Sequence, residues 1–158
     1  MLDADADLKV RDAELNDAAE LAALICELGY QTSNSEMEAR LASILKDARY
    51  KTLVALKDEK ICGMIGTLST SSYLHNDLTG RITALVVSRE LRRCGIGARL
   101  IAAAEKNFTQ RGITRVTLTT RFEREEAHQF YVRLGYLRTG FRFAKVLRHS
   151  VRPGLTDC

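Results

Sequence analysis

The sequence predicts an α/β (α+β) fold, in which a mixed, mostly antiparallel twisted sheet is flanked by about four helices. Three observations predict it. Strand and helix patterns follow one another in the order strand, two helices, three strands, helix, strand, helix, strands. Two of the three consecutive strands flank a charged hairpin signal at 57–60, which favours antiparallel pairing. The helix pattern after the third strand leads into another strand, and such a crossover joins parallel strands.

Length and composition indicate a single soluble domain over residues 1–158, with residues 1–7 and 149–158 as flexible tails. Apolar residues make up 46% of the chain and charged residues 28%, both ordinary for a globular protein. The net charge of +4 suits an anionic cofactor but is too small and dispersed to indicate nucleic acid. No apolar run approaches the ~20 residues of a membrane span, and the acidic N-terminus is unlike a secretory leader. We therefore expect a cytoplasmic protein without a membrane or nucleic-acid partner.

The cysteines show neither a CxxC pair nor metal-ligand spacing, so we expect no metal site. Cys26 and Cys62 lie in apolar stretches and are predicted to be core residues. Cys158 is terminal. Cys94 stands beside two arginines, where a thiol can become reactive, although many residue types would serve at a position that only supplies a backbone N–H.

The first two helices are predicted from capping boxes and apolar faces. A strand at 8–11 precedes the box Asp17-x-x-Glu20, and Gly29 is a natural stop for the helix that follows. The box Ser35-x-x-Glu38 begins the second helix. The residues expected to point inward from the two helices are Leu21, Leu24, Ile25, Leu28, Met37, Leu41, Ile44 and Ala48.

The remaining strands are apolar runs at 52–56, 61–68, 82–87 and 115–120, with two further strand-like pieces around Gly140 in residues 136–147. Gly63 and Gly66 predict a bulge or a close backbone approach within their run. The run at 82–87 is predicted to be a buried strand because it is short and apolar. The polar residues at 69–80 form the loop in front of it.

A phosphate-binding turn is predicted where the strand at 82–87 leads into the next helix. The helix follows Gly95-Ile96-Gly97, and glycines let a ligand approach the backbone closely. Unpaired N–H groups and the partial positive charge of a helix start attract anions, and Arg92 and Arg93 add two cations. The pattern therefore predicts a diphosphate site. The inward face of this helix is expected to carry Leu100, Ile101, Ala104 and Phe108.

Two common diphosphate motifs do not fit. The Walker pattern needs a Lys-Ser/Thr pair, and none follows the glycines. The dinucleotide fingerprint needs a third glycine three residues after Gly97 and an acidic ribose contact, and both are missing. The pattern Arg-x-x-Gly-x-Gly at 92–97 instead resembles the acyl-CoA site of the GNAT N-acetyltransferase family.

A second signature agrees with this resemblance. The segment Phe130-Tyr131, followed by Gly135-Tyr136, resembles the family's helix that ends in Phe-Tyr-x-x-x-Gly-aromatic. Ahead of the first motif, 85–87 resembles the strand that pairs with the pantetheine arm. The resemblance covers residues 82–136 in order and spacing, and the flanking segments fit the same fold.

The resemblance implies an enzyme that transfers an acetyl group from acetyl-CoA to a primary amine of a small molecule, peptide or protein, by direct attack in a ternary complex. A backbone N–H of Val86 or Val87 would polarise the thioester, and Tyr131 would protonate the leaving thiolate. The residues that the resemblance assigns to the cofactor are Leu85, Val86, Val87, Arg92, Arg93, Cys94, Gly95, Ile96, Gly97, Ala98 and Arg99.

The general base is where this chain departs from the family pattern. Some members of the family carry a Glu on the central strand. Many carry an Asn a few residues before the Ala that corresponds to Ala127, in the helix that contains Tyr131. This chain has no carboxylate at 82–87 and reads Glu-Arg-Glu-Glu at 123–126. We expect proton removal through ordered water, with His128 and Glu123 as candidate bases. These glutamates also fit a solvated helix start, and Tyr131 also fits a core aromatic.

Two other functions remain open from the sequence. An acyl-CoA-binding sensor or regulatory domain without turnover fits the same motifs, and assays on a panel of amines separate it from an enzyme. A nucleic-acid binder using Arg138, Arg142, Arg148 and Arg152 lacks interleaved aromatics and a known motif. The loops at 30–35 and 69–80 are the expected acceptor walls and carry no decisive charge pattern. Strand edges near the C-terminus favour a homodimer.

Overall fold

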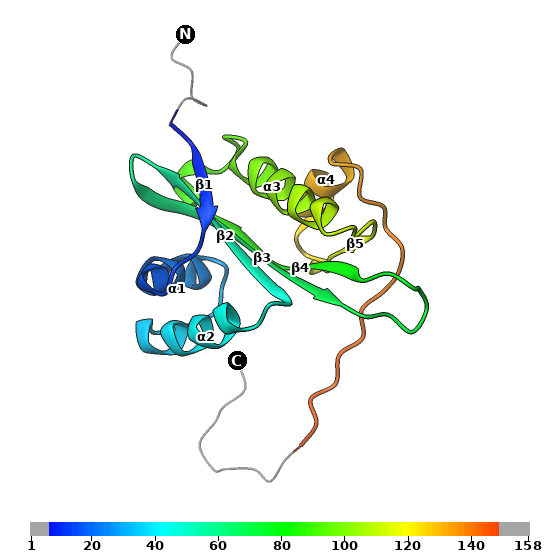
Figure 1. Ribbon diagram of the computed structural model, residues 1–158. Coiled ribbons are helices and arrows are strands. Elements are labelled where there is room, and N and C mark those ends of the chain that lie inside the picture. Colours follow the sequence, from blue (N-terminus) through cyan, green and yellow to red (C-terminus); the bar gives the residue numbers. More distant parts are fainter. Residues whose placement is uncertain (1–6, 149–158) are drawn as a thin grey trace. The chain divides into compact units, whose positions relative to one another are not determined.

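The computed structural model describes residues 7–148, which form an α/β structure (Figure 1). The chain divides into two compact units, Met1–Thr120 and Arg121–Cys158, here named the first and the second unit. The single domain over 1–158 stays a prediction, and the expected tails lie outside the described residues except for Asp7. No helix among residues 7–148 is both long and apolar enough to span a membrane.

The first unit is built on a five-stranded sheet with the order β1-β2-β3-β4-β5. Neighbouring strands are antiparallel from β1 to β4, whereas β4 and β5 are parallel. The expected mixed, mostly antiparallel sheet is therefore confirmed. Its strands are β1 (Lys9–Asp12), β2 (Tyr50–Lys57), β3 (Lys60–Thr70), β4 (Thr79–Val87) and β5 (Val116–Thr117).

Helices cover both faces of this sheet. Figure 1 shows α1 (Ala18–Glu27) and α2 (Asn34–Lys46) on one side and α3 (Ile96–Gln110) on the other. Short 3-10 turns, η1 (Leu15–Asp17) and η2 (Arg89–Leu91), precede α1 and the turn before α3. On the α1 and α2 side, the core includes Val54, Met64 and Val86, which pair in register across three strands.

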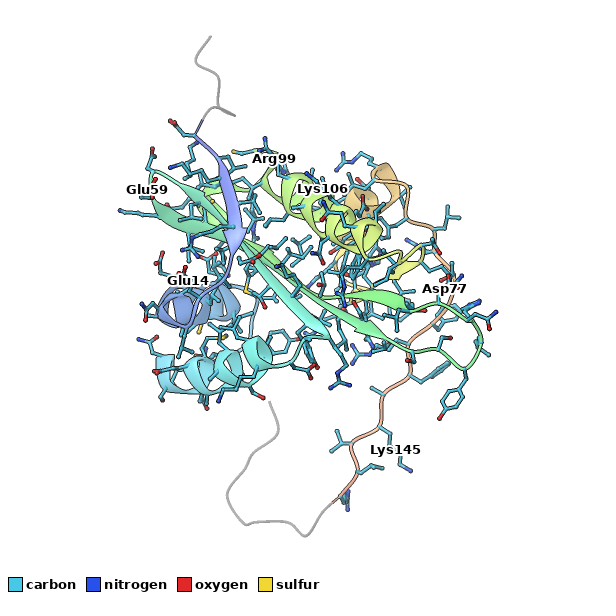
Figure 2. The ribbon with its side chains drawn as sticks, in the orientation of Figure 1. Glu14, Glu59, Asp77, Arg99, Lys106 and Lys145 are labelled. Carbon is cyan, nitrogen blue, oxygen red and sulfur yellow. The ribbon has the colours of Figure 1, made fainter. Side chains whose placement is uncertain are left out.

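The α3 face is packed closely because two glycines leave room for helix side chains. A Cβ at Gly63 would lie 3.1 Å from Leu100 Cδ1, and one at Gly80 would lie 2.8 Å from the ring of Phe108. The predicted inward face of α3 is confirmed, since Leu100, Ile101, Ala104 and Phe108 are all buried. Figure 2 shows the side chains of Arg99 and Lys106 on the solvent side of the same helix.

Both predicted capping boxes are wrong, and the reason is local competition. Asp17 binds Arg11 and the N–H of Glu14 instead of capping α1 with Glu20. The second capping box is formed by Ser33 and Glu36, two residues earlier in the chain than the predicted pair, so α2 begins at Asn34. Gly29 has φ 105° and terminates α1 as expected.

The predicted inward residues of these two helices are partly confirmed. Leu21, Leu24, Met37 and Leu41 are buried. Ile25, Leu28 and Ile44 are half-buried, and Ala48 is exposed because α2 ends at Lys46.

The strand predictions fail near the C-terminus. The run at 115–120 forms a strand only at Val116–Thr117, and residues 136–147 form none. In the second unit, the described residues contain one helix, α4 (Glu125–Arg133). Gly135 has φ 91° and stands directly after the helix end, as expected. Strands need a partner for their backbone groups, and a pattern along one segment does not reveal whether that partner is present.

Candidate functional site

The site begins at an open edge of β4. β4 pairs with β3 over its whole length but with β5 only at Gly80 and Arg81. From Ile82 to Val87, no strand in the described part of the chain pairs with the β5 side of β4. The strand's N–H and C=O groups on that side are therefore available to an extended ligand.

A bulge lies where this open edge begins. Gly66 faces Ala84 and Thr67 faces Ile82, so Thr83 is an extra residue in β4. An extra residue bends a strand and increases its twist. The prediction of a fully buried strand is wrong here, because Thr83 is exposed and only Ile82 and Val86 of this run are buried.

The connection after β4 is held by three hydrogen bonds that backbone N–H groups donate. The N–H of Ser88 donates to the carbonyl of Cys62 at 2.8 Å, and the N–H of Leu91 donates to Ser88 at 3.0 Å. The N–H of Arg89 donates to the carboxylate of Glu27 at 3.0 Å. Glu27 is the last residue of α1, where the helix dipole disfavours a negative charge. An acidic residue at a helix C-terminus signals a carboxylate that is engaged elsewhere, but no sequence pattern identifies Arg89 as its partner.

The turn into α3 contains two residues in the left-handed region. Arg93 has φ 63° and Gly95 has φ 78°. A non-glycine residue with positive φ is uncommon and costs roughly 1–2 kcal/mol. Such turns point successive N–H groups toward one side and form anion-binding concavities. The strain at Arg93 therefore marks this turn as a functional candidate.

The start of α3 leaves its N–H groups without a side-chain cap. Gly95 is the N-cap residue and no acidic residue stands in the first turn. Helical bonding begins with the N–H of Arg99, which donates to Gly95 at 3.1 Å. The N–H groups of Ile96, Gly97 and Ala98 precede the first intrahelical bond and are thus suited to an anion.

The surface of this turn is cationic. Arg92, Arg93 and Arg99 are exposed, and the Nε of Arg92 donates to the carbonyl of Val87 at 3.3 Å. Cys94 is a free, exposed thiol whose Sγ lies 3.6 Å from the carbonyl oxygen of Arg92. The structure thus brings the predicted cofactor residues from Leu85 to Arg99 together in the first unit.

The other two described cysteines differ from each other. Cys62 is buried as predicted, and burial raises the pKa of its thiol. Cys26 is only half-buried, and its Sγ donates to the carbonyl of Thr32 at 3.4 Å. Cys158 lies outside the described residues. Residues 7–148 contain no group of three His, Cys, Asp or Glu side chains that could hold a metal ion.

Tyr131 lies on α4 in the second unit. Its ring packs edge-on against Phe130 at 5.2 Å and Tyr136 at 5.9 Å, measured between centroids. The N–H of Tyr136 donates to the carbonyl of Tyr131 at 3.0 Å. Burial raises the pKa of the Tyr131 phenol, and the positive charge of Arg124 opposes this effect. The phenol is therefore protonated at neutral pH and can act as a donor.

His128 already has partners on both ring nitrogens. Nε2 lies 2.9 Å from the carbonyl oxygen of Arg121, and Nδ1 lies 3.3 Å from Nη2 of Arg138. A carbonyl only accepts and a guanidinium only donates, so both contacts fit the neutral ring with its proton on Nε2. Nδ1 is thus the acceptor of the Arg138 guanidinium.

Glu123 is exposed and precedes α4, because Arg124 is the N-cap residue. Glu123 therefore lies just outside the helix that carries Tyr131 and His128. Glu125, His128 and Arg138 line a shallow hollow together with Phe122 and Gln129.

Comparisons with known proteins agree on one family. The model of the acetyltransferase (GNAT) family matches residues 16–136. An aminoalkylphosphonate N-acetyltransferase of Salmonella typhimurium LT2 is 34% identical over 144 residues, which cover 88% of this chain and 91% of the relative.

Solved structures agree as well. A GNAT family acetyltransferase of Staphylococcus aureus USA300_TCH1516 is 28% identical, with a TM-score of 0.78 and coverage of 89% of this chain and 99% of that one. An aminoglycoside acetyltransferase from an uncultured soil sample, solved with trehalose, shares the fold at a TM-score of 0.79 and 23% identity, covering 91% and 99%. The chain is therefore a member of the GNAT family of acetyltransferases.

Proposed function

We propose that this acetyltransferase moves an acetyl group from acetyl-CoA to a primary amine of a small molecule, by direct attack in a ternary complex. One observation carries the proposal: the open edge of β4 runs directly into the strained, uncapped turn before α3. Acyl-CoA has an arm with two amide groups followed by a diphosphate. An open strand edge suits the amides, and a helix start with free N–H groups suits the diphosphate.

The cofactor residues proposed from the sequence fit these two parts. Leu85, Val86 and Val87 would hydrogen-bond the pantetheine through their backbone. The segment from Arg92 to Arg99 would bind the diphosphate through N–H groups and the exposed arginines. The side chain of Ile96 is buried, so this residue would contribute its backbone only.

Acetyl transfer requires a neutral amine, a donor to the thioester carbonyl oxygen and an acid for the leaving thiolate. The amine nitrogen, once neutral, forms a C–N bond to the thioester carbon while the C–S bond breaks. A backbone N–H of Val86 or Val87 would stabilise the negative charge on the carbonyl oxygen. Tyr131 would give its phenolic proton to the leaving thiolate, because a phenol is protonated at neutral pH and can donate as charge develops on the sulfur.

The proton lost by the amine would leave through ordered water, with His128 or Glu123 as the side chain that finally accepts it. Nδ1 of His128 already accepts a hydrogen bond from Arg138. Glu123 is exposed and can exchange protons with water. The pH profile of kcat/KM tests the assignment. If the profiles of both His128→Ala and Glu123→Gln match the wild type, neither residue is the base.

The acceptor we propose is a small amine that carries a phosphonate, by analogy with the name of the relative at 34% identity. The assay measures free thiol released from acetyl-CoA with aminoalkylphosphonates, polyamines, aminoglycosides and a lysine peptide. Turnover with the phosphonates supports this acceptor class. Turnover only with other amines overturns the acceptor and keeps the enzyme, whereas binding of acetyl-CoA without any turnover favours a sensor.

Cofactor binding has its own test. Acetyl-CoA and CoA should raise the thermal midpoint, because a ligand that binds only the folded state stabilises it by mass action. NAD and ATP at equal concentration should not. A folded Gly97→Val variant that binds acetyl-CoA like the wild type would contradict the diphosphate assignment.

We also propose a second copy of the chain as its protein partner, with no nucleic-acid or membrane partner, and a cytoplasmic location.

A further inference from the structure

β4 carries a cation on the face of the sheet opposite α3. Gly80 faces α3, because a Cβ at this position would lie 2.8 Å from the ring of Phe108. Successive side chains of a strand point to opposite faces, and β4 pairs in regular register with both neighbouring strands at Gly80 and Arg81. The side chain of Arg81 therefore points to the face that carries α1 and α2 (Figure 1).

Thr83 lies on the same face because of the bulge. Met64 belongs to the core under α1 and α2, and alternation places Gly66 on the same face of β3. A Cβ at Gly66 would lie 3.0 Å from Oγ1 of Thr83, so the Thr83 hydroxyl lies over this glycine. Ala84 pairs with Gly66 in register and packs against the same core. The bulge thus puts two consecutive side chains of β4 on one face, and Thr83 is the polar one.

The apolar core on this face ends at Ala84. Ala84 is half-buried against the core, whereas Arg81 and Thr83 are exposed. The residues in register with Arg81 are Leu68 on β3 and Thr117 on β5, and neither is charged. Among the described residues of the first unit, no carboxylate pairs with Arg81. An exposed guanidinium without a counter-charge, with a hydroxyl beside it, suits a small anion.

This pair of side chains lies close to the proposed position of the thioester. α3 packs closely on its own face, so an acceptor has to approach the open edge of β4 from the other face. The three steps from Thr83 to Val86, whose N–H is a proposed donor to the carbonyl oxygen, span roughly 10 Å. Arg81 stands about 7 Å further along the strand, and its long side chain can lean toward Thr83. An amine at the thioester with an anionic group a short alkyl chain away fits this spacing.

We propose that Arg81 binds the phosphonate of the acceptor, and that Thr83 donates a further hydrogen bond to it. A guanidinium matches two oxygens of such a group at once, and a hydroxyl can donate to the third. The inference rests on the function proposed above and names the two residues that select its acceptor. They determine specificity, and the acetyl transfer itself uses other groups.

The test uses the full chain with acetyl-CoA and two amines. One is aminoethylphosphonate, and the other is the aliphatic amine in which a tert-butyl group of similar shape replaces the phosphonate. Arg81→Gln removes the cation. Lys106→Gln removes the same charge from the solvent side of α3, on the opposite face of the sheet (Figure 2), and is the matched control.

Arg81→Gln should raise the KM for aminoethylphosphonate by about 10- to 150-fold, as loss of a hydrogen bond between charged groups does. Its effect on the tert-butyl amine should be smaller, and Lys106→Gln should match the wild type. Thr83→Val keeps the shape of the side chain and should raise the KM for the phosphonate by about 2- to 12-fold. Arg81→Lys keeps the charge without the bidentate geometry, so its KM should lie between those of the wild type and Arg81→Gln.

Equal KM values for aminoethylphosphonate in Arg81→Gln and Lys106→Gln would overturn the assignment and leave the proposed acceptor in place. An equal loss with both amines would overturn it too, because Arg81 would then support the sheet instead of recognising the phosphonate. If Arg81→Gln does not fold, a wild-type KM in Arg81→Lys has the same meaning.

A binding measurement separates this assignment from the reaction. Calorimetric titration of aminoethylphosphonate into the chain saturated with CoA involves no turnover, and Kd should rise in Arg81→Gln by the same factor as KM. Binding that Arg81→Gln weakens supports the site even where the wild type shows no acetyl transfer, and then only the proposed reaction fails. A wild type that neither binds nor acetylates aminoethylphosphonate overturns the proposed acceptor and this assignment together.

Discussion

Glycines at the two ends of α3 make it possible to test cofactor binding by the turn before the helix separately from the cost of its left-handed backbone. Gly95 stands before the helix with φ 78°, and Gly112 stands after it with φ 73°. An added Cβ would meet nothing within 4 Å at either position. Gly95→Ala and Gly112→Ala therefore carry nearly the same backbone penalty and no steric clash.

The magnitude follows from this geometry. Left-handed backbone costs an L-residue roughly 1–2 kcal/mol, so both variants should lose about that much free energy of unfolding. For a chain of this size, this corresponds to a lower melting temperature by about 2–8 °C. Urea titration and thermal melts without ligand measure the loss, which should be equal for the two variants.

Binding of acetyl-CoA should distinguish them. In Gly95→Ala the strained turn is expected to shift the N–H groups before α3 from the positions that would bind the diphosphate. A lost hydrogen bond to a charged group is worth about 1.5–3 kcal/mol, which corresponds to about 10- to 150-fold in Kd. Gly112→Ala should bind acetyl-CoA like the wild type in calorimetric titration. If Gly95→Ala matches its control in both stability and Kd, the turn does not bind the diphosphate.

Three further predictions test other parts of the molecule. Tyr131→Phe should fold and bind acetyl-CoA almost unchanged while kcat falls by about 10²–10⁴-fold; intact turnover would make Tyr131 a packing residue. Glu27→Ala should raise the KM for acetyl-CoA by about 5- to 10-fold through loss of the Arg89 anchor. Glu20→Ala is its control, because Glu20 accepts the N–H of Ile61 at the same 3.0 Å but away from the turn; equal KM values would exclude a positioning role for Glu27. Asp17 has a pKa below its usual value because Arg11 hydrogen-bonds it, so its contribution to stability is present above the unfolded-state pKa of about 3.9. That contribution is lost as pH falls through the lower folded-state pKa, so stability measured by urea titration from pH 6 to pH 2 should fall less steeply in Asp17→Asn than in the wild type, and parallel curves would contradict this linkage.

Periodicity and glycine positions carried most of what the sequence could predict. The inward face of α3 and the helix ends near Gly29 and Gly135 depend on contacts within a few residues, and all are found in the structure. Overlapping local signals misled the prediction of α2, because Ser33 and Ser35 are each followed by a Glu three residues later. The structure uses the first pair.

Long-range partners explain the other misses. Asp17 has the residue type of a cap but is engaged by Arg11 from β1. Glu27 holds a backbone N–H that is 62 residues further along the chain, and no local pattern reveals that distance. The segment at 136–147 has the composition of strands, yet composition does not supply the neighbour that a strand requires.

Gly66 shows how one small residue links the packing of the sheet to the candidate site. A Cβ at Gly66 would lie 3.0 Å from the Oγ1 of Thr83, the extra residue of the β4 bulge. The extra residue lies two positions after Arg81, which is the last residue of β4 paired with β5. Because a bulge bends and twists its strand, the extra residue accounts for the end of that pairing and for the open edge from Ile82 to Val87. The glycine on β3 makes room for the bulge, and the open edge that follows leads straight into the turn before α3.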